Sequence, residues 1–210
     1  VLDLYNNDHA RNWFKTDKLD ADGSRANDPF SGQNWLSVIQ TVNLAEDPTD
    51  AQWYQSVLAG TADTAPGSIK LRANARHYFS RGVQATLNHE FQTQAVDYSF
   101  EAGLRLHEDG EDRLQRDSTY HQEGGRLILD DLGQWGNAGN EIQTAEALAA
   151  YFQGRIAFKS LVISPGLRFE NIHQFRTRWE TRFDKTLDPA SRNDDNLRDQ
   201  RKNRVQVLLP

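Results

Sequence analysis

The chain has 210 residues and is 26% charged and 37% hydrophobic, with a formal net charge of −6 and a mean hydropathy of −0.77. It contains no run of about 18 apolar residues, which excludes a transmembrane helix but not a transmembrane barrel, in which half of every strand is polar. Cysteine is absent, so neither a disulfide framework nor a thiolate metal site is expected. The mild acidity and the lack of a clustered basic stripe argue against a nucleic-acid partner.

The N-terminal third combines one strand with a long excursion. Residues 1–16 read as a strand that becomes more polar towards its far end. Residues 17–67 are rich in Asp, Asn, Gly and Pro, and a loop of this length is usually functional. Within it, 34–43 fits either a strand or a short helix, whereas 50–60 fits a helix. That helix would be capped by Thr49 or Asp50, present Trp53, Tyr54, Val57 and Leu58 on its apolar face, and stop at Gly60.

The clearest element is a hairpin between residues 82 and 107. Apolar and polar residues alternate over 83–91 and again over 96–106, with only a few residues around 93–95 between the two runs. Alternation places one set on each face of a strand, so the runs are expected to pair as an antiparallel hairpin. The polar face is densely charged. It either meets bulk water or lines a wet interior while the apolar face turns to lipid. The same parity extends back to Ile69, so 68–92 is expected to form one strand.

The C-terminal half alternates short strands with charged segments. Residues 107–125 are charged and rich in turn formers, 126–132 fits a strand, and 113–144 as a whole reads as a long connection. Residues 148–158 fit a strand or a helix. We favour the strand because the two-residue joint Lys159-Ser160 leads straight into the next alternating run. That run continues towards Trp179, with a local irregularity at Pro165. Residues 181–203 read as a charged loop, after which a final strand begins.

The connections suggest a membrane barrel. Tight turns near 94 and 159 alternate with long connections at 17–67, 113–144 and 181–203, and short turns at one end with long loops at the other are typical of outer-membrane barrels. About six strands are too few to close a barrel with such loops, and both chain ends look cut through strands. We therefore expect an all-β fold in which residues 1–210 form part of an antiparallel transmembrane β-barrel, internal to a larger protein.

Several segments resemble one family, the TonB-dependent outer-membrane receptors, and most closely their ferric-dicitrate-receptor branch. They are LRANARHYFSRGVQATL (71–87), FEAGLRLHEDGEDRLQRD (100–117), EALAAYFQGRIAF (146–158) and SPGLRFENI (164–172). The patterns Gly-Leu-Arg-Leu-His-x-Asp-x-x-x-Arg and Pro-Gly-Leu-Arg-Phe-Glu are the most specific. The resemblance covers roughly 68–172 well and the remainder loosely.

The resemblance implies a 22-stranded barrel with an N-terminal plug in the bacterial outer membrane, which takes up an iron chelate such as ferric citrate or another siderophore. The chelate would be the transported ligand, and no resident cofactor is expected. Implied partners are membrane lipid or lipopolysaccharide, the plug domain with the remaining strands, and TonB itself. The plug, the TonB-contacting segment and the C-terminal strands are not in this sequence, so the chain would supply barrel wall and outer loops, including a short helix.

Two sets of charged residues are candidates for a role in transport. Guanidinium groups suit carboxylates, so arginines at the outer vestibule could bind an anionic chelate; these are Arg11, Arg72, Arg76, Arg81, Arg176 and Arg178. Charges on the polar strand faces could line the lumen and bond the plug; these are Glu90, Glu101, Arg105, Arg155, Arg168 and Glu170. The competing interpretations are solvated strand ends for the first set and interstrand ion pairs for the second. Loop aromatics such as Trp13, Trp35, Trp53, Tyr54 and Trp135 fit packing better than ligand contact.

Other functions fit less well. The six histidines show no HxH or HExxH spacing, so no metal site is expected. His89 interrupts the apolar face and would mark the membrane interface, and residues 107–112 read as a charged turn rather than a calcium loop. The carboxylates Glu90, Glu101 and Glu170 could supply a glycosidase pair, but no nucleophile or phosphate-binding motif accompanies them, so we expect no enzyme. The remaining alternatives are a soluble all-β ligand-binding module and a passive porin-like barrel.

Overall fold

The computed structural model describes residues 1–19, 48–181 and 190–210 of the chain, apart from the side chains of 48–51. Within these ranges the fold is all-β, with one α-helix and one turn of 3₁₀ helix (Asp194–Asn196). The helix is α2, Pro48–Leu58. The strands are β1 Leu2–Lys18, β2 Ile69–Gln92, β3 Val96–Glu123, β4 Arg126–Asp131, β5 Gly139–Phe158, β6 Leu161–Ile163, β7 Gly166–Trp179 and β8 Leu197–Leu209.

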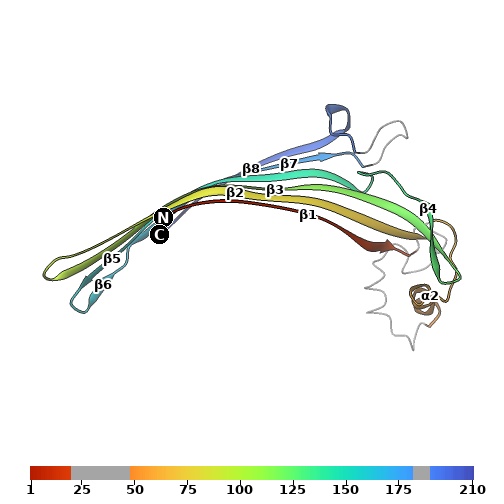
Figure 1. Ribbon diagram of the computed structural model, residues 1–210, viewed down its shortest axis with the longest axis horizontal. Helices are drawn as coiled ribbons and strands as arrows, with labels where there is room; N and C mark the ends of the chain where they lie inside the picture. Colours follow the sequence, from red (N-terminus) through yellow and green to blue (C-terminus); the bar gives the residue numbers. More distant parts are fainter. Residues whose placement is uncertain (20–47, 182–189) are drawn as a thin grey trace.

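All strands belong to one antiparallel sheet. Its six long strands lie in the order β1-β2-β3-β5-β7-β8, and the short strands β4 and β6 pair with β3 and β5. The sheet is open, with β1 at one edge and β8 at the other, and it arches along the strands (Figure 1). The tight turns lie at one end of the arch, and α2 and β4 lie at the other. Neighbouring long strands thus pair in chain order, as the sequence predicts. The described strands do not close into a barrel.

The two faces of the sheet differ in kind. We call the face that carries Val83 and Leu104 the apolar face, and the face that carries Gln84 and Arg105 the charged face. One register row on the apolar face crosses all six long strands and consists of Leu2, Ala85, Leu104, Ala150, Phe169 and Leu208. The neighbouring row on the charged face consists of Asp3, Gln84, Arg105, Ala149, Glu170 and Val207. At the same height on the strands, one face is wholly hydrocarbon and the other is charged.

Away from the loop end, the large side chains of the apolar face are exposed. Leu4 is 78% exposed, Leu87 71% and Leu104 50%. Monomeric soluble proteins rarely expose contiguous apolar surface of this kind, which we call the apolar band. Towards the tight turns the band becomes aromatic, and the rings of Phe91 and Tyr98 stack with centroids 4.5 Å apart. His89 lies within this band between apolar rows, with its ring 5.7 Å from that of Phe91.

Glycines in the long strands make room for aromatic rings on neighbouring strands. A Cβ atom at Gly82 would lie 2.4 Å from the hydroxyl oxygen of Tyr5. Because this space is empty, Tyr5 on β1 reaches across β2, and its hydroxyl bonds Nδ1 of His107 on β3 at 2.6 Å. Gly103 faces the ring of Tyr151 in the same manner. These two glycines therefore serve close cross-strand packing rather than turns.

A small core lies at the loop end of the sheet, where α2 packs onto the apolar-face parity of β2. It consists of Leu19, Tyr54, Val57 and Ile69. Gln122 of β3 fixes the helix end by donating to the carbonyl oxygens of Val57 (2.9 Å) and Ala62 (2.6 Å). The helical prediction for 50–60 is confirmed, and Gly60 follows the helix with φ of +75°. The helix begins at Pro48, however, so Thr49 and Asp50 lie inside it, and Leu58 is exposed rather than packed.

The predicted strands are confirmed, but three segments expected to be loops are strand. Residues 107–123 continue β3 without a break, so residues 107–112 are not a turn, and the connection expected at 113–144 shrinks to 132–138 and the β3–β4 turn. Likewise β8 begins at Leu197, inside the segment read as the loop 181–203. The irregularity expected at Pro165 separates β6 from β7. The segment 34–43 lies outside the described residues.

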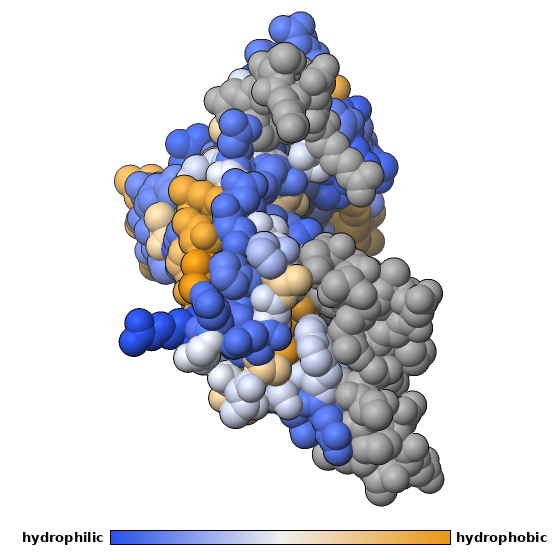
Figure 2. Space-filling model, turned by 90° about the vertical axis from the view of Figure 1, so that its right-hand side faces the viewer, coloured by the Kyte–Doolittle hydropathy of each residue, from blue (hydrophilic) through white to orange (hydrophobic). Residues whose placement is uncertain are grey.

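The loop end of the molecule is mainly hydrophilic. Seen from the end that carries α2 and β4, polar residues dominate the described surface, and hydrophobic residues gather in a narrow strip (Figure 2). Within the described ranges, no helix is both long and apolar enough to cross a membrane.

Candidate functional site: an arginine belt on the charged face

The highest density of charge lies on the charged face, between the apolar band and the loops. One register row there has a charged residue on each of the six long strands: Arg11, Arg76, Arg113, Glu141, Arg178 and Asp199. The next row towards the turns adds Arg176 and Arg201, which lie directly opposite each other on β7 and β8. We call these two rows the arginine belt. Glu111 also lies in the second row and pairs with Arg76 at 2.9 Å. The two rows hold six arginines against the carboxylates of Glu111, Glu141 and Asp199, so the belt is a net positive surface on a chain of net charge −6.

Glu141 is the anion that holds the middle of the belt together. Its side chain is 6% exposed and bridges Arg113 on one side (2.9 Å) and Arg176 on the other (2.6 Å). Burial is the largest single influence and opposes ionisation. The hydrogen bond from Arg176 and the charges of Arg113 and Arg176 together outweigh burial, so the pKa of Glu141 is lowered. Glu141 therefore stays ionised and spaces two guanidinium groups that would otherwise repel each other.

Two further ion pairs lie in the belt and beside it. Arg178 on β7 makes a bidentate contact with Asp199 on β8, with N–O distances of 2.5 and 2.7 Å. The hydrogen bond from Arg178 is the main reason that the pKa of Asp199 falls to about 2. Nearer the loops, Arg72 donates to both oxygens of Asp117 and also reaches Asp17 at 3.0 Å. The hydrogen bond to Asp117 is the main cause of a raised pKa at Arg72.

The belt borders a hollow of about 630 Å³ on the charged face. Its walls carry hydroxyl, amide and guanidinium groups, including Tyr78, Gln143, Gln174, Arg176 and Arg201, together with the carboxylates of Asp109 and Glu111. Guanidinium forks match carboxylates and phosphates. The hollow therefore suits a polar ligand whose anionic groups face Arg176 and Arg201.

The six predicted ligand-binding arginines do not share one surface. Arg11, Arg72, Arg76, Arg176 and Arg178 lie on the charged face, all of them in or beside the belt. Arg81 lies on the apolar face, where it pairs with Glu108 at 2.7 Å. Strand parity explains the difference, because Arg81 is an odd number of residues from Arg72 and Arg76.

The six predicted lumen residues all lie on the charged face, at the level of the apolar band or nearer the turns. Their contacts are mostly local. The Tyr151 hydroxyl donates to Glu101 at 2.5 Å, and Arg168 donates to Glu170 at 2.8 Å. Arg105 donates to the Tyr5 hydroxyl at 3.1 Å. The interpretation as interstrand and local pairs thus accounts for part of this set, and a role towards a plug stays a prediction.

Sequence reasoning missed four of the residues by which the belt is defined. Arg113, Glu141, Asp199 and Arg201 lie in segments predicted to be loops, so no strand parity was assigned to them. A usable signal was the even separation of Arg113 from Arg105, which places both on the same face once a continuous strand is assumed.

Three of the histidines, His77, His107 and His121, pair with aspartates. No group of three or more His, Asp or Glu residues that could hold a metal ion occurs in the described part of the chain. Trp53 packs against the small core beside α2. The guanidinium of Arg116 lies 4.6 Å from the ring of Trp135. Trp35 lies outside the described residues.

Comparison with known proteins adds no relative. No family model, no curated protein and no solved structure matches this chain. The case for a function therefore rests on the geometry of the two faces and on the motifs of residues 71–172.

Proposed function

We propose that this chain is a wall section of an outer-membrane β-barrel receptor that takes up an anionic iron chelate with energy delivered through TonB. The observation that carries the membrane part is the contrast between the faces. At one height on six neighbouring strands, the apolar face exposes only hydrocarbon side chains, while the charged face presents Asp3, Arg105 and Glu170. This is the distribution expected of a sheet with lipid on one side and a polar lumen on the other.

The dimensions of the apolar band support a bilayer. On β3, the alternate positions from Val96 to Leu106 are apolar throughout. Ten residue steps of about 3.3 Å give a strand length of about 33 Å, which rises about 25 Å when the strand is tilted by about 40°. The apolar band of transmembrane barrels is about 25 Å tall. The aromatic pair Phe91 and Tyr98 near the turns fits the aromatic girdle at one interface.

The arginine belt supports the anionic ligand. It lies beyond the apolar band towards the long connections, which is the vestibule side in this proposal, and it faces the lumen. The iron chelate, the plug and TonB come from the family resemblance and rest on it alone. In this mechanism the chelate binds at the belt, the outer loops close over it, and the plug then moves aside.

Charge removal at the belt tests the ligand. The variant Arg11→Gln/Arg76→Gln/Arg201→Gln, made in the full-length gene product, should weaken binding of ferric citrate by at least about tenfold, because one hydrogen bond to a charged group contributes about 1.5–3 kcal/mol. Isothermal titration at two salt concentrations measures it, and affinity should fall with salt. The matched control is Arg105→Gln/Arg155→Gln/Arg168→Gln, three arginines of the same face nearer the turns. Equal affinity in the two triple variants would contradict the belt as ligand site.

A further inference from the structure

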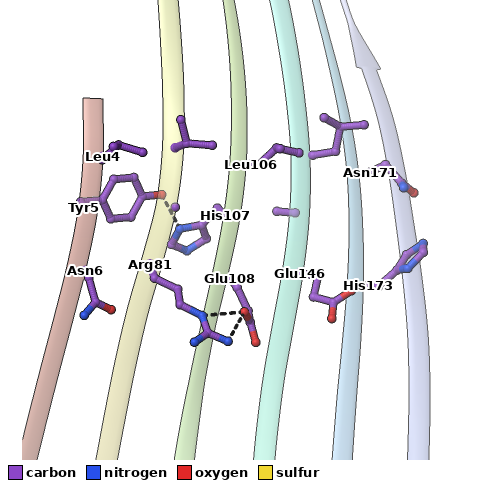
Figure 3. A pocket seen from close by; sticks show the side chains of 14 residues that line it. Leu4, Tyr5, Asn6, Arg81, Leu106, His107, Glu108, Glu146, Asn171 and His173 are labelled. Carbon is purple, nitrogen blue, oxygen red and sulfur yellow. Dashed lines mark hydrogen bonds and ion pairs between the residues drawn. The ribbon is translucent and has the colours of Figure 1, made fainter. Parts of the chain in front are cut away.

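The polarity of the two faces is reversed on β7 and β8 at the loop-side border of the apolar band. The apolar-face row that carries Leu106 on β3 reaches Asn171 on β7 (Figure 3) and Gln206 on β8. On the charged face, the adjacent positions of the same two strands are Ile172 and Val205. An amide that faces hydrocarbon needs a hydrogen-bond partner, because a polar group left unpaired in lipid is costly. This part of the apolar face therefore fits contact with protein better than contact with lipid.

The next row towards the loops is acidic in one half and basic in the other. Glu108 on β3 and Glu146 on β5 are followed by His173 on β7 and Arg204 on β8, and Figure 3 shows the first three side by side. Arg81 neutralises Glu108 at 2.7 Å. Among the described residues, Glu146 and Arg204 have no ion-pair partner, and Nε2 of His173 is buried without a hydrogen bond. The row therefore presents one carboxylate and one guanidinium without counter-ions, with a histidine between them.

This order of charges is complementary to itself under one particular rotation. Two copies that stand upright in one membrane are related by a twofold axis along the membrane normal. The rotation keeps the height of every residue and exchanges the two sides, so each row meets the same row of the other copy in reverse order. With the axis in front of His173, Glu146 and Arg204 lie about 4.8 Å to either side of it. Sheets that pack face to face are about 10 Å apart, so Glu146 of each copy is within reach of Arg204 of the other.

We propose that the apolar face of β5, β7 and β8 is a twofold interface between two copies of this protein, held by two symmetry-related ion pairs of Glu146 with Arg204. Asn171 and Gln206 exchange hydrogen bonds with the second copy, since an amide both donates and accepts. The recess of about 900 Å³ that Glu146, Asn171 and His173 help to line receives side chains of that copy. This inference rests on the proposed function, because the membrane sets the direction of the axis.

Charge exchange tests the interface. The full-length gene product is purified in detergent, and sedimentation equilibrium measures its dimerisation. Glu146→Arg and Arg204→Glu should each weaken the dimer by at least about tenfold, because each places like charges across the axis. The double variant Glu146→Arg/Arg204→Glu should restore the dimer, since it re-forms both pairs in the opposite sense. The matched control is Asn6→Arg, an exposed position of the same row on β1, and it should leave dimerisation unchanged.

Cross-linking in phospholipid vesicles locates the axis. A single cysteine at His173→Cys, in a cysteine-free background, should join two copies through a short bis-maleimide, because a residue at the axis meets its own counterpart. A single cysteine at Asn6→Cys should not, since β1 lies four strand spacings, about 19 Å, from β7. Equal cross-linking at the two positions would contradict the placement of the axis.

The outcomes separate the interface from the membrane barrel, because flotation of the same protein with vesicles checks the barrel independently. A protein that floats but stays monomeric, or whose dimer is unaffected by both single charge exchanges, overturns the interface and leaves the barrel standing. A double variant that stays monomeric overturns the pairing of Glu146 with Arg204. A protein that does not float overturns the proposed function, and the interface falls with it.

Discussion

Leu87→Arg is expected to destabilise the folded protein in a lipid bilayer by about 2–4 kcal/mol, the cost of an arginine near the middle of a barrel's lipid face. Leu87 lies near mid-height of the apolar band, and its neighbour Asn88 points to the charged face opposite Glu101. Asn88→Arg is therefore the matched control, with the same new side chain one residue away, and its effect should be within about 0.5 kcal/mol. Denaturant titration of the full-length gene product in phospholipid vesicles, followed by tryptophan fluorescence, measures both.

This pair of variants also separates the membrane barrel from a soluble binding module. In water, Leu87 is 71% exposed, so replacing it by arginine would remove exposed hydrocarbon and leave stability almost unchanged. Equal, small effects of Leu87→Arg and Asn88→Arg would therefore sink the lipid-facing assignment. A passive porin predicts the same large asymmetry as the receptor, and the two differ in the arginine belt and its affinity for a ferric chelate.

The sequence predicted the fold best where the two faces differ most in polarity. The hairpin around residues 93–95 and the strand back to Ile69 were recoverable because hydrocarbon and polar residues alternate along them. Beyond the apolar band both faces are polar, so alternation carries no hydropathy contrast. The sequence therefore predicts loops at 107–123 and 197–203, where the structure has strands. Their charges are satisfied across strands by partners far away in the sequence, and a single strand does not reveal such partners.

The lack of hydropathy contrast also limits prediction of the candidate site. The sequence predicts the belt-side arginines that flank clear alternation, which are Arg72, Arg76, Arg176 and Arg178. Glu141, which bridges β5 to both β3 and β7, has its partners 28 and 35 residues away and carries no local mark. Arg81 is an odd number of residues from Arg76, so strand parity alone places it on the other face.

Glu141→Gln is expected to lower the stability of the protein at pH 7 by about 2–3 kcal/mol, somewhat below the 3–5 kcal/mol typical of a broken buried ion pair. The discount reflects its partners Arg113 and Arg176, which are about one-third exposed and keep part of their hydration. The amide retains the shape of the carboxylate but not its charge, so the two guanidinium groups repel across β5. Denaturant titration at pH 7 measures the loss. Glu170→Gln is the control, because among the described residues the ion-pair partner of Glu170 is Arg168 on its own strand, and its replacement should cost less than about 1 kcal/mol.

The pH dependence of this difference tests the electrostatic cause. The pKa of Glu141 in the folded protein lies below its ordinary value of 4.5. A group with a lowered pKa contributes its full stabilisation above the ordinary value and loses it as the pH falls through the folded value. The gap in stability between the wild type and Glu141→Gln should therefore be constant from pH 7 to about pH 5 and shrink under more acidic conditions, as the wild-type carboxyl takes up its proton. A gap that persists unchanged at strongly acidic pH would mean that Glu141 acts through packing rather than through its charge between Arg113 and Arg176.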